Sequence, residues 1–186
     1  MEKCETTEYN ELEKYGNATV EFKPKILLDA LREVFLQPGM ESSNSLCVLN
    51  FNMHLARMLP FAQFKDFVGN LTHLLKNRKK LLGSKARVVW RTTTALNYRG
   101  IFNRAWTSKY LTSDRVLLFD AYALSEMCKS EIDVLDCYPM SMATPLATDR
   151  VHFKTGIFFK AMDALTWYSL AGGLDPPRTT KLCLAP

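Results

Sequence analysis

The chain has 186 residues, 47% of them hydrophobic, and 24 basic against 19 acidic residues give it a formal net charge of +5. This length and composition fit one globular domain and exclude a disordered or fibrous chain. The densest basic run, residues 76–80, closes an apparent helix, where cations favour the helix dipole, and no aromatic residues interleave with it. We interpret this run as a solvated helix end and expect no nucleic-acid partner.

The cysteines do not form a metal-binding or dense disulfide pattern. There is no C-x-x-C pair among Cys4, Cys47, Cys128, Cys137 and Cys183, so a zinc site is not indicated. A single Cys128–Cys137 bridge is left open, and Cys47, in an apolar run, is expected to be a buried apolar residue.

No apolar run is long enough to span a membrane, and the acidic start does not resemble a signal peptide. We therefore expect no membrane span. Two N-x-S/T sequons, at Asn17 and Asn70, matter only if the protein enters the secretory pathway.

The first third of the chain reads as a strand, a helix and a second strand. Residues 1–16 are polar and are expected to be a lead-in to a single domain over 17–171. Alternation predicts a short strand at 19–22, and apolar residues at helical spacing predict a helix over 26–36. The continuous apolar run 46–49 predicts a strand buried on both faces.

Polar residues 50–54 follow that strand, at the position where open α/β sheets place their sites. Amphipathic spacing then predicts a long helix over 61–82, and Gly83 suits its end. The next strand is predicted at 86–90, with 91–94 as its exit loop. This alternation continues the α/β pattern.

Residues 98–129 show a helical pattern interrupted near 112–114, where Ser113 or Asp114 would cap a second helix. The last strand is predicted at 132–136. After it we expect, in order, a loop through 138–141, a closing helix over 156–168 and a disordered tail over 172–186. Strands alternating with helices predict an α/β fold with a mostly parallel sheet.

An acid three residues before a histidine, Asp149 and His152, precedes the predicted closing helix and is followed at once by Phe153. A hydrolase uses this arrangement when the acid orients an imidazole that acts as general base. A lone D-x-x-H also occurs by chance in surface loops and capped helix starts. No glycine-rich phosphate loop is present, so the sequence does not favour nucleotide binding.

Four segments carry a resemblance to a known family. Asn52 follows one central strand, residues 90–93 follow the next, and 134–141 and 149–153 come after them in order. Over residues 45–170 this resembles the later part of an SGNH (GDSL-type) esterase domain, nearest to the PC-esterase and NXPE-like branch. The resemblance implies a three-layer α/β/α sandwich with a flavodoxin-like parallel sheet.

The resemblance also implies a function. Relatives act as esterases or acyltransferases on O-acyl groups of carbohydrates or lipids, often acetyl esters of glycans, so an acylated glycan or another ester is the implied partner. The secretory pathway or Golgi is the implied compartment. Trp90, Trp106 and Tyr138 would stack on a sugar if exposed, although aromatic residues near strand ends more often belong to the core.

By the same resemblance, Asp149 orients the imidazole and His152 is the general base. Asn52 is the nearest match to the amide that binds the oxyanion, although residues 50–53 read N-F-N-M where the family commonly shows G-x-N-D. His54 is an alternative polar contributor, and its plain interpretation is a loop histidine with satisfied hydrogen bonds. Because Asp149 and His152 supply only two ligands, we expect no metal and no other cofactor.

The nucleophile is the main departure from the family. No serine of the chain lies in a G-D-S context, and 19–22 resembles the family's second strand more than its first. A parallel sheet without its central first strand exposes unpaired edges. Three explanations stay open: the remaining portion of a longer esterase domain, a non-catalytic relative that binds through its pocket or surface, or an enzyme with a displaced nucleophile. A displaced nucleophile would have Ser45 and Ser141 as candidates, but neither lies in the expected turn directly after a strand, the nucleophile elbow.

Overall fold

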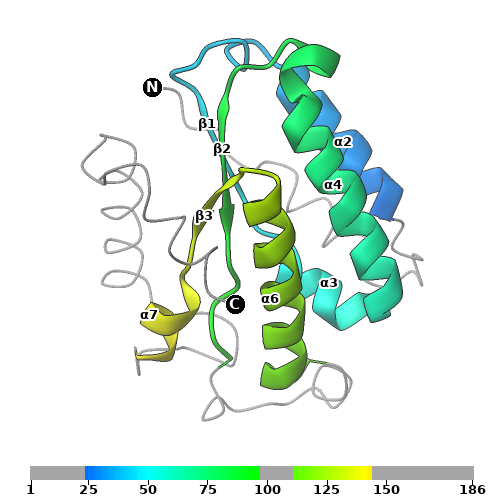
Figure 1. The fold of residues 1–186 in the computed structure, drawn as a ribbon, viewed down its shortest axis with the longest axis vertical. Coiled ribbons are helices and arrows are strands. Elements are labelled where there is room, and N and C mark those ends of the chain that lie inside the picture. Colours follow the sequence, from blue (N-terminus) through cyan, green and yellow to red (C-terminus); the bar gives the residue numbers. More distant parts are fainter. Residues whose placement is uncertain (1–23, 97–110, 144–186) are drawn as a thin grey trace, which may run out of the picture. The chain divides into compact units, whose positions relative to one another are not determined.

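The structure is a computed structural model of the chain, and it describes residues 24–96 and 111–143, with only the backbone of Met140. Along the chain lie α2 (Pro24–Leu36), β1 (Leu46–Leu49), α3 (Asn52–Met58), α4 (Phe61–Leu82), β2 (Arg87–Arg91), α6 (Ser113–Lys129), β3 (Asp133–Leu135) and α7 (Tyr138–Met142), as Figure 1 shows. The strand expected at 19–22, the closing helix at 156–168 and the tail at 172–186 lie outside the described residues.

The described strands form a small parallel sheet in the order β1-β2-β3. β2 and β3 pair in parallel, with Trp90 opposite Val134 and Arg91 opposite Leu135. Strands alternating with helices confirm the predicted α/β class. The three-layer SGNH-like architecture and the single domain over 17–171 stay predictions.

The burial of β1 differs from the prediction. Cys47 and Leu49 are buried, but Val48 is 42% exposed, so burial on both faces is wrong. Successive side chains of a strand point to opposite faces, and β1 lies at the edge of the described sheet. Trp90, in the middle strand, is 0% exposed and meets Phe51 edge-on with ring centroids 6.1 Å apart.

The chain divides into two compact units, which we describe separately. The first comprises Met1–Cys47 with Asn77–Arg87. Within its described residues, the carbonyl of Met40 accepts hydrogen bonds from Lys85 N (2.9 Å), Ala86 N (3.0 Å) and Ser84 Oγ (2.9 Å). This carbonyl therefore joins the turn after α2 to the segment that enters β2.

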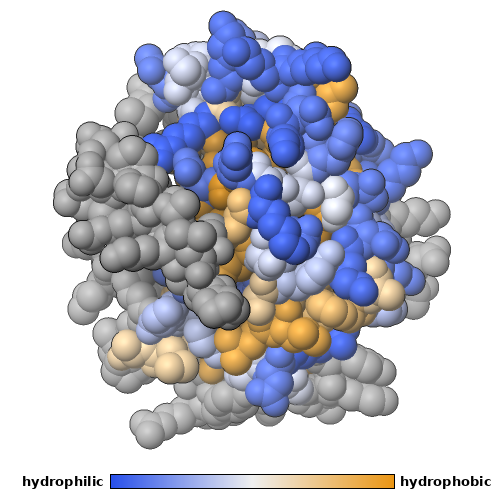
Figure 2. Space-filling model, in the orientation of Figure 1, coloured by the Kyte–Doolittle hydropathy of each residue, from blue (hydrophilic) through white to orange (hydrophobic). Residues whose placement is uncertain are grey.

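The carboxyl end of α4 also belongs to this unit. Gly83 follows the helix with φ of +71°, the left-handed conformation that glycine adopts at helix ends, and confirms the predicted stop. Lys79 and Lys80 lie exposed in the last turn, and the surface around this end is largely hydrophilic in Figure 2. Lys79 and Lys80 thus form a solvated helix end, whereas Arg78 of the same run donates two hydrogen bonds to Ala86 O, at 3.0 and 2.8 Å. None of the helices in the described ranges is long and apolar enough to cross a membrane.

The second unit comprises Val48–Lys76 with Val88–Pro186. Its described core contains a cluster of aromatic rings: the rings of Phe64 and Phe119 lie 4.3 Å apart between centroids, and Phe61 lies 5.2 Å from Phe119 and 5.6 Å from Tyr122. These contacts join the first half of α4 to α6. α6 also packs against α3 and β3, as Figure 1 shows.

The start of α6 is held by specific contacts. Thr112 caps the helix, because its side chain accepts a hydrogen bond from Arg115 N at 3.2 Å. The predicted caps, Ser113 and Asp114, are therefore wrong by one and two residues. The guanidinium of Arg115 donates to the carbonyls of Ala56 and Leu59, which fixes the carboxyl end of α3 to the start of α6.

The loop predicted at 138–141 is wrong, because Tyr138–Met142 form the short helix α7. Pro139 lies in its first turn, where a missing backbone N–H costs nothing and a fixed φ favours the helix. A proline therefore begins a helix here, where the sequence pattern suggested a turn. α7 follows β3 closely and forms one side of the region described next.

Candidate functional site

A buried aspartate joins the exits of β1 and β2 to α6. Asp120, on α6, is 6% exposed. Its Oδ1 accepts hydrogen bonds from Asn52 Nδ2 at 2.5 Å and from Thr93 Oγ1 at 3.0 Å. The backbone N–H of Thr93 lies 3.0 Å from Oδ2 and 3.2 Å from Oδ1. Asn52 begins α3 and Thr93 follows β2, so one carboxylate holds three elements.

The environment of Asp120 shifts the pKa of its carboxyl. Burial raises the pKa of this carboxyl above its usual value, the hydrogen bonds from Asn52 and Thr93 lower it, and the nearby charge of Asp136 raises it. The rise wins. Asp120 therefore takes up a proton at a higher pH than an exposed aspartate would.

A second set of hydrogen bonds joins the exits of β2 and β3. The hydroxyl of Thr92 donates to Asp136 Oδ1 at 2.8 Å and accepts from Cys137 N at 2.8 Å. The backbone N–H of Tyr138 donates to the same oxygen of Asp136 at 3.1 Å. Thr92 also extends the pairing of β2 with β3, since its N–H donates to Leu135 O at 3.0 Å. The loops after these strands are thus held together at the carboxyl end of the sheet.

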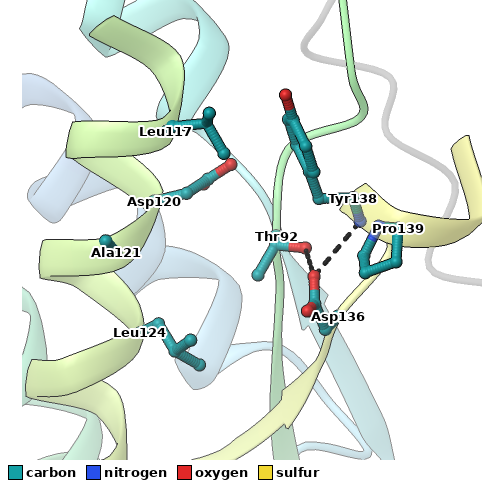
Figure 3. Close-up of a pocket in the computed structure, with 8 residues that line it drawn as sticks. All are labelled: Thr92, Leu117, Asp120, Ala121, Leu124, Asp136, Tyr138 and Pro139. Atoms are coloured by element: carbon teal, nitrogen blue, oxygen red, sulfur yellow. Dashed lines mark hydrogen bonds between the residues drawn. The ribbon is translucent and has the colours of Figure 1, made fainter. Parts of the chain in front are cut away.

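A small open pocket of about 170 Å³ lies between α6 and these exits. Figure 3 shows Asp120 reaching toward it from α6 and Asp136 from the segment after β3. It is lined by Thr92, Leu117, Asp120, Ala121, Leu124, Asp136, Tyr138 and Pro139. Pockets for drug-sized ligands are about 300–1,000 Å³, so this one suits a single small group of a larger ligand. Figure 2 shows apolar surface over the lower part of α6, where Leu117 and Leu118 are 41% and 50% exposed.

The two described site predictions lie on α3 and do not come together. Asn52 is 0% exposed; its Nδ2 is committed to Asp120, and its Oδ1 has no hydrogen-bond partner among the described residues. His54 is exposed, because residues two apart on a helix face different directions. Neither side chain lines the pocket. The roles given to Asn52 and His54 stay predictions.

The predicted acid and base, Asp149 and His152, lie outside the described residues. Their pairing therefore stays a prediction. Among the described residues, no group of three or more His, Cys, Asp and Glu side chains is placed to hold a metal ion.

The Cys128–Cys137 bridge, which the sequence left open, is not formed, because Cys137 is a free thiol that is 0% exposed. Burial raises the pKa of Cys137 to about 12; the charge of Arg91 opposes this rise, and the charges of Asp136 and Asp120 add to it. Its Sγ contacts the carbonyl of Leu135 at 3.7 Å. Cys47 is buried at 7% exposure, as predicted.

Both serines considered as displaced nucleophiles are engaged in structural hydrogen bonds. Ser141 is 2% exposed, and its Oγ accepts from Ala95 N and donates to Tyr138 O, both at 2.8 Å. The hydroxyl of Ser45 donates to Gly39 O at 2.6 Å. These bonds use the hydroxyl protons that a nucleophile would give to a base.

Trp90 belongs to the core, as the plain interpretation held. It is 0% exposed, and its Nε1 has no hydrogen-bond partner among the described residues. A role for Trp90 in stacking on a sugar is therefore wrong. Tyr138 lines the pocket, and Trp106 lies outside the described residues.

The sequence analysis missed Asp120 as a site residue, although a signal was present. Val116, Phe119, Ala123 and Met127 form the buried stripe of α6, and Asp120 falls on it, four residues after Val116 and three before Ala123. An acid on the apolar face of an amphipathic helix is unusual. Thr92 and Asp136 lie inside two of the segments that carry the family resemblance, 90–93 and 134–141. The sequence pattern of these segments assigned neither residue a role.

Comparison with protein-family models, curated proteins and solved structures found no match to this chain.

Proposed function

We propose that the chain is an SGNH-like α/β domain that binds an O-acyl ester of a carbohydrate or lipid and does not hydrolyse it on its own. One observation carries the proposal. The segments after β1, β2 and β3, which carry the family resemblance, are joined by the hydrogen bonds of Asp120 with Asn52 and Thr93 and of Asp136 with Thr92. The carboxyl ends of parallel strands are where open α/β sheets bind ligands.

In this proposal Asp149 orients His152, which would take the proton of a serine as that serine attacks the ester carbonyl. The chain offers no serine in a G-D-S context. Ser45 and Ser141 hold backbone carbonyls instead. In this proposal the acid and base therefore lack a serine in the family's sequence context, and the expected activity is binding without turnover.

The first test is intact-mass detection of a fluorophosphonate adduct on the folded chain, with His152→Ala in parallel. We expect no adduct on either protein and no acetate released from triacetin, a small O-acetyl ester. An adduct on the parent that disappears in the variant would contradict catalytic incompleteness, because it would require a serine activated by His152.

The second test asks whether an ester binds at the carboxyl ends of the strands. The isotope-labelled chain is titrated with triacetin, with glycerol as the matched ligand that lacks acyl groups, and backbone amide resonances are followed. We expect triacetin alone to shift the resonances of Thr92, Thr93 and Asp136. Equal responses to both ligands, or none at these residues, would remove the ester site.

The alternative is a non-catalytic interaction module on the same scaffold. The observation that favours it is the exposure of Leu117 and Leu118, neighbours on α6, at 41% and 50%, together with the engaged hydroxyls of Ser45 and Ser141. Such a module needs neither an ester nor the Asp149–His152 pair. This alternative would be favoured if triacetin shifts no resonances of the chain and if His152→Ala behaves like the parent toward the fluorophosphonate probe.

A further inference from the structure

We propose that the end of the first unit where α2 and α4 both stop is a docking surface for a lipid bilayer with anionic headgroups. This docking surface consists of exposed lysines with exposed leucines among them: Lys79, Lys80, Lys85, Leu36 and Leu81. All of these residues belong to the first unit, and none lines the pocket at the strand ends. The docking surface is therefore independent of the proposed ester site.

Backbone contacts bring the two helix ends together. Leu36 is the last residue of α2, and Leu81 lies in the last turn of α4. The carbonyl of Met40, in the turn after α2, accepts hydrogen bonds from the backbone N–H groups of Lys85 and Ala86. Figure 1 shows the last turns of α2 and α4 at the same end of the unit. The leucines and the lysines thus lie at one end of this unit.

Positive charge dominates this end. Residues 33–47 and 77–87 hold five basic residues against two acids, Glu33 and Glu41. The carboxylate of Glu41 accepts a hydrogen bond from Gly39 N at 2.8 Å. None of the lysines of the docking surface forms an ion pair with an acid in the described part of the chain. Their ammonium groups are therefore available to an anionic ligand.

The helix dipole accounts for only part of this charge. Lys79 and Lys80 lie in the last turn of α4, where cations stabilise a helix. The effect falls off within that turn, whereas Lys85 comes three residues after the helix ends. Like charges at one end of a fold also repel one another. An anionic ligand would remove this repulsion.

The exposed leucines favour lipid over other anions. Leu36 and Leu81 are 62% and 54% exposed. Apolar side chains among lysines suit a bilayer, because the headgroups attract the cations while the acyl region takes the apolar groups. Single-stranded nucleic acid instead stacks its bases on aromatic side chains, and residues 76–87 hold none. The side chains of this end therefore match anionic lipid.

Cosedimentation of the full chain with lipid vesicles at low ionic strength tests the proposal. One set of vesicles contains phosphatidylserine in phosphatidylcholine, and the other is pure phosphatidylcholine, which carries the same acyl esters but no net charge. We expect binding to the first set alone, and we expect it to weaken as salt is added, because salt screens surface charges. Equal binding to both sets, which ester recognition would give, or binding to neither, would overturn the proposal.

Lysine variants locate the charged part of the docking surface. Lys79→Gln/Lys80→Gln should weaken binding about 25-fold, because each basic residue near an anionic membrane contributes roughly fivefold. The control, Lys25→Gln/Lys65→Gln, removes the same charge at exposed positions elsewhere and should weaken binding by less than about threefold, since distant charges are screened. Equal losses in the two double variants would mean that net charge alone drives binding, and would contradict the assignment.

Leucine variants distinguish a lipid from another anion. Leu36→Ala/Leu81→Ala should weaken vesicle binding at least about fivefold without a change of charge, because the variant offers less apolar area to the acyl region. Ile26→Ala, at a 60% exposed position near the other end of α2, is the control and should bind like the parent. Unchanged binding by the leucine variant, or tighter binding of a single-stranded oligonucleotide than of the anionic vesicles, would overturn the assignment to lipid.

Discussion

The side-chain amide of Asn52 donates a 2.5 Å hydrogen bond to the carboxylate of Asp120, and the two residues are separated by 68 positions in the sequence. The bond joins the first residue of α3 to the middle of α6. Both side chains are buried, at 0% and 6% exposure. A polar contact in this setting is costly to break from one side, because the remaining partner keeps its desolvation penalty.

Asn52→Ala should therefore destabilise the fold by about 1–3 kcal/mol, the cost of leaving a buried acceptor short of a donor. Urea unfolding at neutral pH measures this change. Gln63→Ala, at an exposed position on α4, is the control and should stay within about 0.5 kcal/mol of the parent. Equal effects of the two substitutions would show that the Asn52 bond contributes nothing.

The pH dependence of stability should carry the signature of Asp120. Its pKa in the folded chain is raised above 3.8, so between these two values the folded state binds more protons than the unfolded state. The free energy of unfolding contributed by this group therefore falls as pH rises from near 3.8 through the raised pKa, and is constant above it.

Denaturant unfolding of the parent and of Asp120→Asn across this pH range measures that contribution. The difference in unfolding free energy, parent minus variant, should decrease with rising pH and then level off. An increase with pH would mean that the pKa of Asp120 is lowered on folding and would contradict the burial argument.

Cys137 should resist alkylation in the folded chain. Its pKa of about 12 leaves roughly a thousandfold less thiolate at pH 8 than an ordinary cysteine has, and the thiolate is the reactive form. Peptide mapping after brief iodoacetamide treatment should find Cys137 unlabelled in buffer and labelled in urea. Rapid labelling in buffer would show that the thiol is accessible.

Ser141→Ala tests whether Ser141 is structural. Loss of its hydroxyl leaves the N–H of Ala95 without its partner in a buried position, so we expect a loss of about 1–3 kcal/mol of stability in thermal or urea unfolding. Reactivity with the fluorophosphonate probe should not change. A parent adduct that is absent from this variant, with stability unaltered, would instead make Ser141 a nucleophile.

The longer helices and the strands were predictable because their signals are local, whereas the short helices α3 and α7 were not predicted. Apolar spacing over 61–82 and the glycine after it define α4, and the short apolar run 46–49 defines β1. The cap of α6 was missed by one or two residues because Thr112, Ser113 and Asp114 are all good capping residues. The backbone geometry alone distinguishes them.

The site was less predictable because its contacts are distant in sequence. Thr93 and Asp120 are 27 residues apart, and Thr92 and Asp136 are 44 apart. Periodicity marks Asp120 as an acid on a buried stripe, but it does not say which donors the fold brings to it. The strand-end rule singled out Asn52 after β1, and the hydrogen bond that its amide makes there depends on α6, which no local pattern relates to α3.

The proposed esterase-type site depends most on Asp149 holding His152 as a base. Nitrogen chemical shifts of the His152 ring, measured in the parent and in Asp149→Asn above the titration range of histidine, report which ring nitrogen carries the proton. We predict a proton on Nδ1 in the parent, where a carboxylate would hold it, and loss of that preference in the variant. The same tautomer in both proteins would contradict the acid–base pair and with it the esterase-type interpretation.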